Sequence, residues 1–202
     1  MNILSNHIVN RVGSAGSKVS VLTTPEMIKM ARSDSFFIRA SVTPDDSDTF
    51  VPTSIDLGSY VDALGKSVLR IHNVSASITT DTGLAPLMDA GVGGACSWQI
   101  TTQDQIAMVL PANRAVVSSG SVWAFNADGV SAVPATAYEA DMLPQEWTNG
   151  YLIAVESLQL GAQATTNWAA SANVTVSVVL ECTVETLTQA AAMALALSQQ
   201  GN

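Results

Sequence analysis

The sequence predicts an all-β fold: an antiparallel β-sandwich of jelly-roll type with about eight strands, a short N-terminal helix and a C-terminal helix. Three observations support this prediction. Short apolar runs separated by turn signals fill most of the chain, which is typical of sandwiches and not of alternating strand–helix folds. Residues 174–184 alternate apolar and polar side chains in one register, as a long half-buried strand does. Helical patterns occur only near the two ends.

Residues 1–34 are expected to form an N-terminal arm that contains the short helix. Gly13 and Gly16 loosen the backbone of its first part. The run Thr23–Glu26 then combines an N-cap hydroxyl, a proline at the first helical position and an early acidic residue. A helix over Pro25–Arg32 is therefore predicted, with an apolar stripe made of Met27, Ile28, Met30 and Ala31.

A single sandwich domain is expected over residues 35–186, without an internal linker. Two irregular stretches, Asp81–Gly94 and Ser131–Pro144, contain glycines or prolines and are expected to be long loops. The turn signal Asn149-Gly150 is expected to start the next strand. The expected strands are Phe36–Val42, Phe50–Leu57, Val68–Ile78, Cys96–Thr101, Gln105–Leu110, Ala115–Val117, Ser121–Phe125, Tyr151–Leu160 and Val174–Val184.

Two finer features are predicted within this frame. The apolar positions of the third expected strand change parity at His72-Asn73, which indicates a β-bulge or a sharp bend. The tail over residues 187–202 is rich in Ala, Leu and Gln, which predicts a helix over Leu187–Gln200. Thr186 or Thr188 is placed to cap that helix.

The chain is unusually poor in charge. Charged residues make up 12% of it, about half the ~25% that is usual in soluble domains. Ser, Thr, Ala, Gln and Asn take their place, so the surface can be buried against a neighbour without stranding many charges. We infer burial in an oligomer. The alternative is an isolated β protein that is merely rich in Thr and Ser.

The few charges are divided unevenly along the chain. The first forty residues hold five bases and two acids, for about +3, whereas the other 162 hold three bases and fifteen acids, for about −12. Repeated over many copies, the early bases would produce a large local field and are candidates for contact with nucleic acid or an inner surface. The alternative is a flexible tail whose bases only aid solubility. These five bases are Arg11, Lys18, Lys29, Arg32 and Arg39.

The residues that support catalysis or metal binding are few. His7 and His72 are the two histidines, and neither stands in a nucleophile-elbow context, so no enzyme activity is expected. Asp45, Asp46 and Asp48 form an acidic cluster that offers oxygen ligands for Ca²⁺. The EF-hand pattern of alternating acids, Gly and a distal Glu is absent, so a solvated turn is favoured over a calcium site between subunits.

Two cysteines, Cys96 and Cys182, lie in apolar runs and are expected to be small buried hydrophobes. No cofactor and no small-molecule substrate are expected. The first twelve residues lack the apolar core of a secretory signal, and no apolar stretch approaches the ~20 residues that span a bilayer. We therefore expect synthesis in the cytoplasm and no membrane span.

A polar, mildly basic arm (Met1–Thr24) followed by a sandwich with long loops resembles the jelly-roll capsid (coat) proteins of icosahedral viruses. The resemblance covers the whole chain and lies in its architecture, without a signature motif. With its acidic body and small uncharged side chains, the chain looks more like a coat protein of a bacterial or archaeal virus than like one of a plant virus.

The resemblance implies a structural virion protein that assembles with copies of itself into a shell around the viral genome. It implies synthesis in the host cytoplasm and a final location in the virion. Other virion proteins are further possible partners. In this family, arms and terminal segments tie neighbours together or face the genome or an internal membrane.

Two alternatives to a shell subunit are open at this point. The chain could be another structural part of a phage, such as a tail-tube or head-decoration protein. It could also be a carbohydrate-binding or adhesin-like module that uses tryptophans as sugar platforms. With aromatic residues at only 5% of the chain, the tryptophans are expected to fill the core or interfaces instead: Trp98, Trp123, Trp147 and Trp168.

Overall fold

The structure, a computed structural model, describes residues 33–44, 48–62, 64, 66–131, 137–141, 145–165, 168 and 173–200. The predicted arm before residue 33, with its helix over Pro25–Arg32, lies outside the described residues. The elements within them are β1 (Phe36–Val42), β2 (Val51–Asp56), β3 (Ser67–Thr80), β4 (Gly93–Thr101), β5 (Val116–Phe125), β6 (Ala137–Asp141), β7 (Gln145–Ile153), β8 (Ser157–Ala164), β9 (Val174–Thr186) and α1 (Gln189–Gln200).

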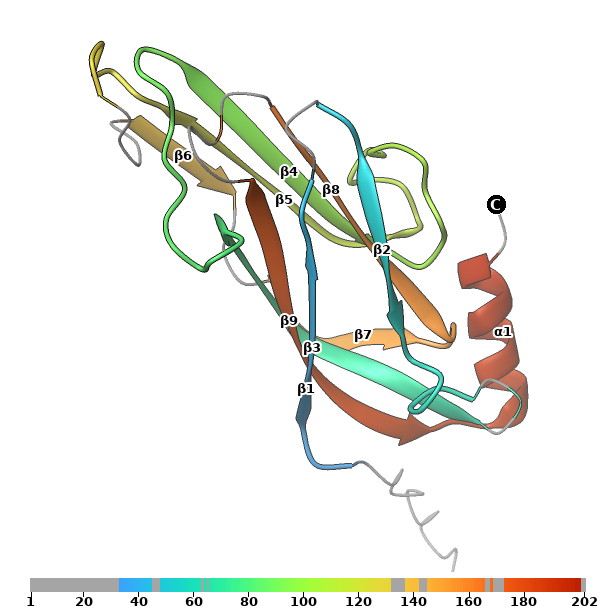
Figure 1. The fold of residues 1–202 in the computed structure, drawn as a ribbon. Helices are drawn as coiled ribbons and strands as arrows, with labels where there is room; N and C mark the ends of the chain where they lie inside the picture. Colours follow the sequence, from blue (N-terminus) through green and yellow to red (C-terminus); the bar gives the residue numbers. More distant parts are fainter. Residues whose placement is uncertain are drawn as a thin grey trace, which may run out of the picture.

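The strands form two antiparallel sheets that pack face to face in an elongated molecule (Figure 1). One sheet has the order β1-β9-β3-β7 and the other the order β2-β8-β4-β5-β6. Consecutive strands alternate between the sheets at β1, β2, β3 and β4, and again at β7, β8 and β9. The chain therefore winds around the sandwich and does not complete one sheet before it starts the other.

The pairing of the strands identifies a jelly roll. β1 pairs with β9, β2 with β8, β3 with β7, and β4 with β5, so strands from the two halves of the chain pair in nested order. This is the pattern of one long hairpin whose two arms have been wrapped together into two sheets. Wrapping adds the pairs β3·β9 and β4·β8, and β6 extends one edge beside β5. The predicted jelly-roll sandwich is confirmed.

The core lies between the two sheets. The inward residues of β9 are buried, as the apolar residues at every second position of this strand predict: Val174, Val176, Val178, Leu180 and Cys182. Leu158 and Leu160 of β8 and Ile100 of β4 meet them from the other sheet and are 0–1% exposed. Full burial of one such aliphatic side chain contributes about 1.5–3 kcal/mol, so this layer is the main source of stability.

The predicted bulge is present at His72. The register of β3 shifts between Ile71 and Asn73 against both neighbouring strands. On β7, Tyr151 is paired with Ile71 and Glu146 with Asn73, so the four residues between them stand opposite His72 alone. Gly150 adopts φ +69° there, a left-handed conformation that glycine tolerates best. Asn149-Gly150 therefore belongs to an excursion of β7, and the expectation that it starts a new strand is wrong.

Other local predictions need correction. No strand lies over Gln105–Leu110; this segment is part of a loop between β4 and β5. The expected strands at Ala115–Val117 and Ser121–Phe125 are one continuous strand, β5. The stretch Ser131–Pro144, predicted to be irregular, contains the edge strand β6. At Gln105–Leu110, apolar residues that face solvent give the same sequence signal as apolar residues of a strand.

The C-terminal helix is confirmed as α1, and its cap is Thr188. The backbone N–H of Ala191 donates to the Thr188 hydroxyl over 3.3 Å, at the third residue of the helix. The Leu187 N–H donates to the carbonyl of Lys66 at the start of β3, which joins the beginning of the tail to the sandwich.

A close approach of backbone and ring gives a first testable prediction. Gly161 in β8 lies directly under the Phe50 ring, and a Cβ at this position would overlap that ring. Gly161→Ala should therefore lower the free energy of unfolding by about 1–3 kcal/mol. Denaturant unfolding measures this change. The control is Gly129→Ala, where a Cβ meets open space and the change should stay within about 0.5 kcal/mol. Equal effects of the two substitutions would contradict the packing of Phe50 on β8.

Candidate functional site

The loop between β4 and β5, residues 102–115, folds over the outer face of the second sheet. Figure 1 shows it in yellow-green beside β2 and the C-terminal end of α1. Strand alternation points Gln99 of β4 and Gln159 of β8 outward, away from their buried neighbours Ile100 and Leu160. Both glutamines are nevertheless buried, at 1% and 8% exposure. They are buried because the 102–115 loop covers them.

The buried amides hold the loop in place. Gln99 accepts a hydrogen bond from the Val109 N–H over 3.0 Å, and Gln159 accepts one from the Gln105 N–H over 2.7 Å. The Thr101 hydroxyl donates to the Gln103 carbonyl over 2.7 Å. Buried amides and backbone groups must be paired, because each unpaired one costs about 1–3 kcal/mol. The loop thus has one preferred conformation on the sheet.

This anchored loop presents aliphatic side chains to solvent. Ile106 is 99% exposed and Leu110 is 78% exposed. Ala107 and Pro111 beside them are also exposed. Single exposed apolar residues are ordinary on protein surfaces, but a group of them on one anchored loop marks a candidate contact surface.

The helix α1 is docked on the same end of the molecule by packing and by one amide. Ala192 and Ala196 pack against Val68 and Ala154. Gln199 accepts a hydrogen bond from the Ala154 N–H over 2.8 Å and donates one to the Leu152 carbonyl over 2.7 Å. Its side chain therefore completes the backbone pairing where β7 ends.

The opposite face of α1 has no partner among the described residues. Leu197 is 67% exposed and Met193 is 41% exposed, and Ala190, Ala191 and Ala194 are exposed as well. The helix has no charged residue in its first or last turn, and its sequence QAAAMALALSQQ has none at all. An uncharged helix face of small and aliphatic residues is suited to close packing against another surface.

The loop and the helix adjoin. The Thr102 hydroxyl and the Gln103 amide both donate to the carbonyl of Gln199, over 3.3 and 2.8 Å. A pocket of about 500 Å³ between Asp104, Glu156 and Gln200 marks one side of this junction. A second pocket, of about 550 Å³, lies between Arg114, Leu195 and Ser198 on the other. We call the 102–115 loop together with the exposed face of α1 the loop–helix surface.

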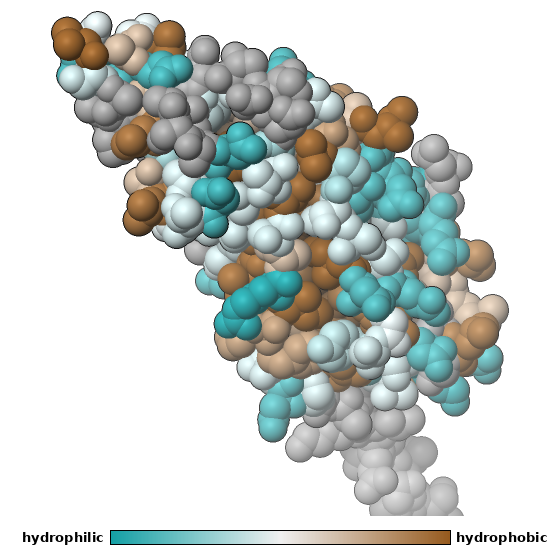
Figure 2. Space-filling view, viewed as in Figure 1, coloured by the Kyte–Doolittle hydropathy of each residue, from teal (hydrophilic) through white to brown (hydrophobic). Residues whose placement is uncertain are grey.

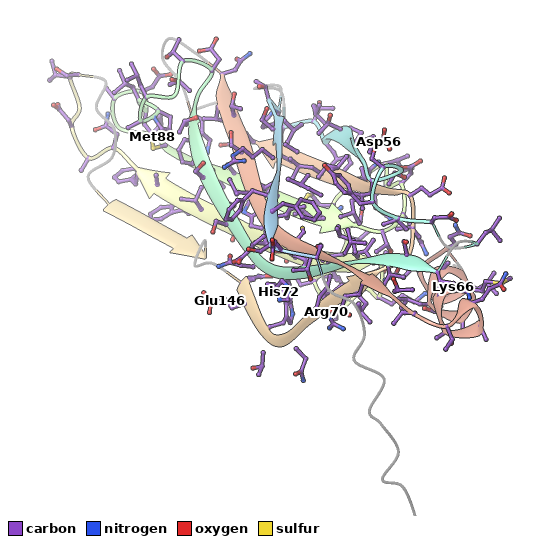
Figure 3. The ribbon with its side chains drawn as sticks, turned by 90° about the horizontal axis from the view of Figure 1, so that it is seen from below. Asp56, Lys66, Arg70, His72, Met88 and Glu146 are labelled. Carbon is purple, nitrogen blue, oxygen red and sulfur yellow. The ribbon has the colours of Figure 1, made fainter. Side chains whose placement is uncertain are left out.

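A buried ion pair joins β3 and β9 in the sheet β1-β9-β3-β7. Arg70 of β3 donates from Nε and Nη2 to the two carboxylate oxygens of Glu185 in β9, each over 2.7 Å. It also donates to the Asn149 carbonyl in the excursion of β7. Figure 3 shows Arg70, His72 and Glu146 along one side of this sheet. Glu185 is 2% exposed, so removal of Arg70 would destabilise the fold, because a buried carboxylate would lose the guanidinium that pairs with both of its oxygens.

The sequence-predicted site residues are only partly described. Arg11, Lys18, Lys29 and Arg32 lie outside the described residues, so their contact with nucleic acid or an inner surface stays a prediction. Arg39 belongs to β1, not to a separate arm, and its guanidinium lies 5.5 Å from the centre of the exposed Phe37 ring.

The acidic cluster is likewise only partly described, because Asp45 and Asp46 lie outside the described residues. Asp48 has φ +60° and accepts a hydrogen bond from the Gln163 amide over 3.0 Å. Among the residues that the structure describes, no group of three His, Cys, Asp or Glu side chains could hold a metal. The calcium site therefore stays a prediction.

The histidine and the tryptophans have mainly structural positions. His72 shares a hydrogen bond with Thr183 over 3.0 Å and is partly buried, as expected for a strand residue bonded to a neighbour. Trp98 and Trp168 are 2–3% exposed and belong to the core. Trp147 packs against the core beside Tyr151, while Trp123 is 47% exposed and stacks on Phe125.

The surface between these features is weakly polar. Figure 2 shows that pale residues of intermediate hydropathy cover much of one face, with hydrophilic and hydrophobic residues scattered among them. No described helix is long and apolar enough to cross a membrane.

Sequence reasoning did not identify the loop–helix surface. Gln99, Gln159 and Gln199 look like ordinary polar surface residues. The partners of Gln159 and Gln199 are distant in sequence, and Gln99 is covered by the loop that follows its own strand. The one local signal is the run 105–112, in which apolar residues recur without strand alternation before Pro111.

No family model matches the sequence, and no curated protein does. Solved structures that are similar at a low level include the following three. The structure of Desmodium yellow mottle tymovirus matches this chain with a TM-score of 0.41 and 12% sequence identity. The matched region covers 85% of this chain and 96% of the other chain. Dimeric latent PorU from Porphyromonas gingivalis has a TM-score of 0.37 and 12% identity, covering 76% and 13%. Infectious bursal disease virus, Gx strain, has a TM-score of 0.21 and 11% identity, covering 88% and 42%.

Two of these three structures are of viruses. Each of these three TM-scores is below 0.5, so the three structures do not indicate a function for this chain.

The docking of α1 gives a second testable prediction. Gln199→Ala removes the partner of the buried Ala154 N–H and of the Leu152 carbonyl, and should destabilise the protein by about 1–3 kcal/mol. Denaturant unfolding and protection of the α1 amides against hydrogen exchange measure it. Gln200→Ala is the matched control, because Gln200 is exposed and adjacent, and its effect should stay within about 0.5 kcal/mol. Equal effects would mean that Gln199 does not dock the helix.

The buried thiols give a third prediction. Burial raises the pKa of Cys96 from 9.0 to about 12, and burial, helped by the charge of Glu181, raises the pKa of Cys182 to about 12. Both thiols are free. In the unfolded chain a thiol loses its proton near pH 8.5. Between about pH 9 and 12 the unfolded state thus binds fewer protons, and stability falls as pH rises.

The expected slope is about 1.4 kcal/mol per pH unit for each thiol over that window, with no contribution below about pH 8. Denaturant unfolding across this pH range measures the slope. The double variant Cys96→Ala, Cys182→Ala isolates it, because every other titrating group is unchanged. The same slope in both proteins would show that the thiols do not cause the loss of stability.

Proposed function

We propose that this chain is a structural virion protein, a subunit that assembles with copies of itself into a capsid shell around a viral genome. The observation that supports this most strongly is the loop–helix surface: an anchored loop and an uncharged helix face that present aliphatic side chains to solvent. A jelly roll alone does not decide function, since the fold has many uses. A chain that fixes apolar residues outward with buried amides is organised to make contacts.

The proposed mechanism is geometric. The sandwich is the rigid body, and its loops and helix make contacts between subunits. The segment before residue 33 would reach neighbours or the interior, where Arg11, Lys18, Lys29 and Arg32 would meet genome phosphates or an internal membrane. The scarcity of charge elsewhere reduces the desolvation cost of each contact. Other virion proteins are further possible partners, and a bacterial or archaeal virus is the proposed source.

Deletion of the first residues gives a fourth testable prediction. The intact chain should form rings or shells, observed by light scattering after size exclusion and by negative-stain imaging. Removal of residues 1–24 should leave the sandwich folded, because β1 begins only at Phe36. Particle formation should be abolished or its geometry changed.

Circular dichroism and thermal unfolding of the truncated chain serve as the control for folding. Unchanged particles after the deletion would refute the role of the arm. An intact chain that is a monodisperse monomer at all accessible concentrations would refute the shell itself.

A further inference from the structure

We infer that the loop–helix surface is a two-fold contact between two copies of this chain, with the exposed face of α1 in one copy packed on the 102–115 loop of the other. This inference deepens the proposed function, since it names the surface through which subunits first associate.

The area that a stable interface buries can be reached only if the loop and the helix are buried together. A 12-residue helix is about 18 Å long and about 10 Å wide, so one face offers roughly 200 Å². A stable interface buries about 800 Å² per partner. The helix face alone is therefore too small. The loop must be buried with it, and the bonds from Thr102 and Gln103 to the Gln199 carbonyl place the two side by side.

The lack of charged side chains in residues 105–113 and in α1 favours a second copy of this chain as the partner. The chain has a net charge of −9, so two copies repel each other over most of their surfaces. Residues 105–113 contain no charged side chain, and neither does α1. Copies can approach here without bringing carboxylates together. A basic partner would instead favour the acidic parts of the surface, such as the rim near Asp104 and Glu156.

The chemistry of the two elements is also complementary. The α1 face offers Ala190, Ala191 and Ala194 as a strip of small side chains beside the larger Met193 and Leu197. The loop offers Ile106 and Leu110 as protruding side chains. Two-fold symmetry uses both contacts twice, because the loop of each copy meets the helix of the other.

The first arm of the test measures association of the full-length protein by sedimentation velocity over a concentration series. Ile106→Asp and Leu197→Asp should each weaken dimer formation at least tenfold, because a carboxylate would be buried without a partner. The matched control is Val130→Asp, which adds the same charge at a 90% exposed position outside this surface. It should leave the affinity within about twofold.

The second arm identifies the pairing by disulfide formation. Cys96 and Cys182 are 0% exposed, so an engineered surface thiol reacts selectively. Protein with Leu197→Cys, mixed with protein that has Ile106→Cys, should give a covalent dimer under mild oxidation. Neither protein alone should do so, nor should a mixture of Leu197→Cys with Val130→Cys.

The outcomes separate this inference from the proposed function. If particles form and the Asp variants associate like the Val130→Asp control, the two-fold contact is refuted and the shell stands. If Leu197→Cys couples efficiently to itself, helices meet helices and the proposed pairing is wrong. If the unmodified chain does not associate at any concentration, the shell and the contact both fail.

Discussion

The position of β9 between β1 and β3 is the constraint on which the rest of the structure depends. It pairs along its whole length with β3 and with β1 on its other edge, and its inward residues Val176 and Leu180 are fully buried. Because the last strand lies beside the first, the two ends of the sandwich sequence meet. Ser33 exchanges hydrogen bonds with Val184 through its backbone N–H and its hydroxyl. Ser33 and the start of α1 therefore lie at the same end of β9, where α1 folds back onto the sandwich.

Neutral amides hold the additions to this frame. Gln99 and Gln159 fix the 102–115 loop, Gln199 fixes α1, and buried Asn126 donates to the carbonyls of Met88, Asp89 and Ser131 to join two loops at the far end. Met88 lies toward the end of the molecule away from Lys66 and α1 (Figure 3). Amides accept and donate at once, and they cost less to bury than carboxylates or ammonium groups. A charge-poor chain can thus position its loops without adding charged side chains to them.

The sequence predicts this fold where burial alone sets the pattern. β9 is correctly predicted because one of its faces lies against the core, so apolar residues occupy every second position from Val174 to Cys182. The bulge at His72 is visible for the same reason, as a change of parity between two buried sets. Prediction fails at Gln105–Leu110, where the apolar side chains of Ile106 and Leu110 face solvent and do not pack into the core. It fails also for Gln159 and Gln199, whose burial depends on contacts far away in sequence.

The two-fold contact inferred here cannot by itself produce a shell. An isologous contact uses the same patch on both copies and closes at a dimer. A closed shell needs at least one further contact between different surfaces, which links dimers to one another. The division of charge favours the N-terminal segment for that contact, because about +3 in the first forty residues meets about −12 in the remainder. Such a contact is electrostatic and would weaken with salt, whereas the uncharged two-fold contact would not. Salt should therefore separate the two steps of assembly and leave dimers as the stable intermediate.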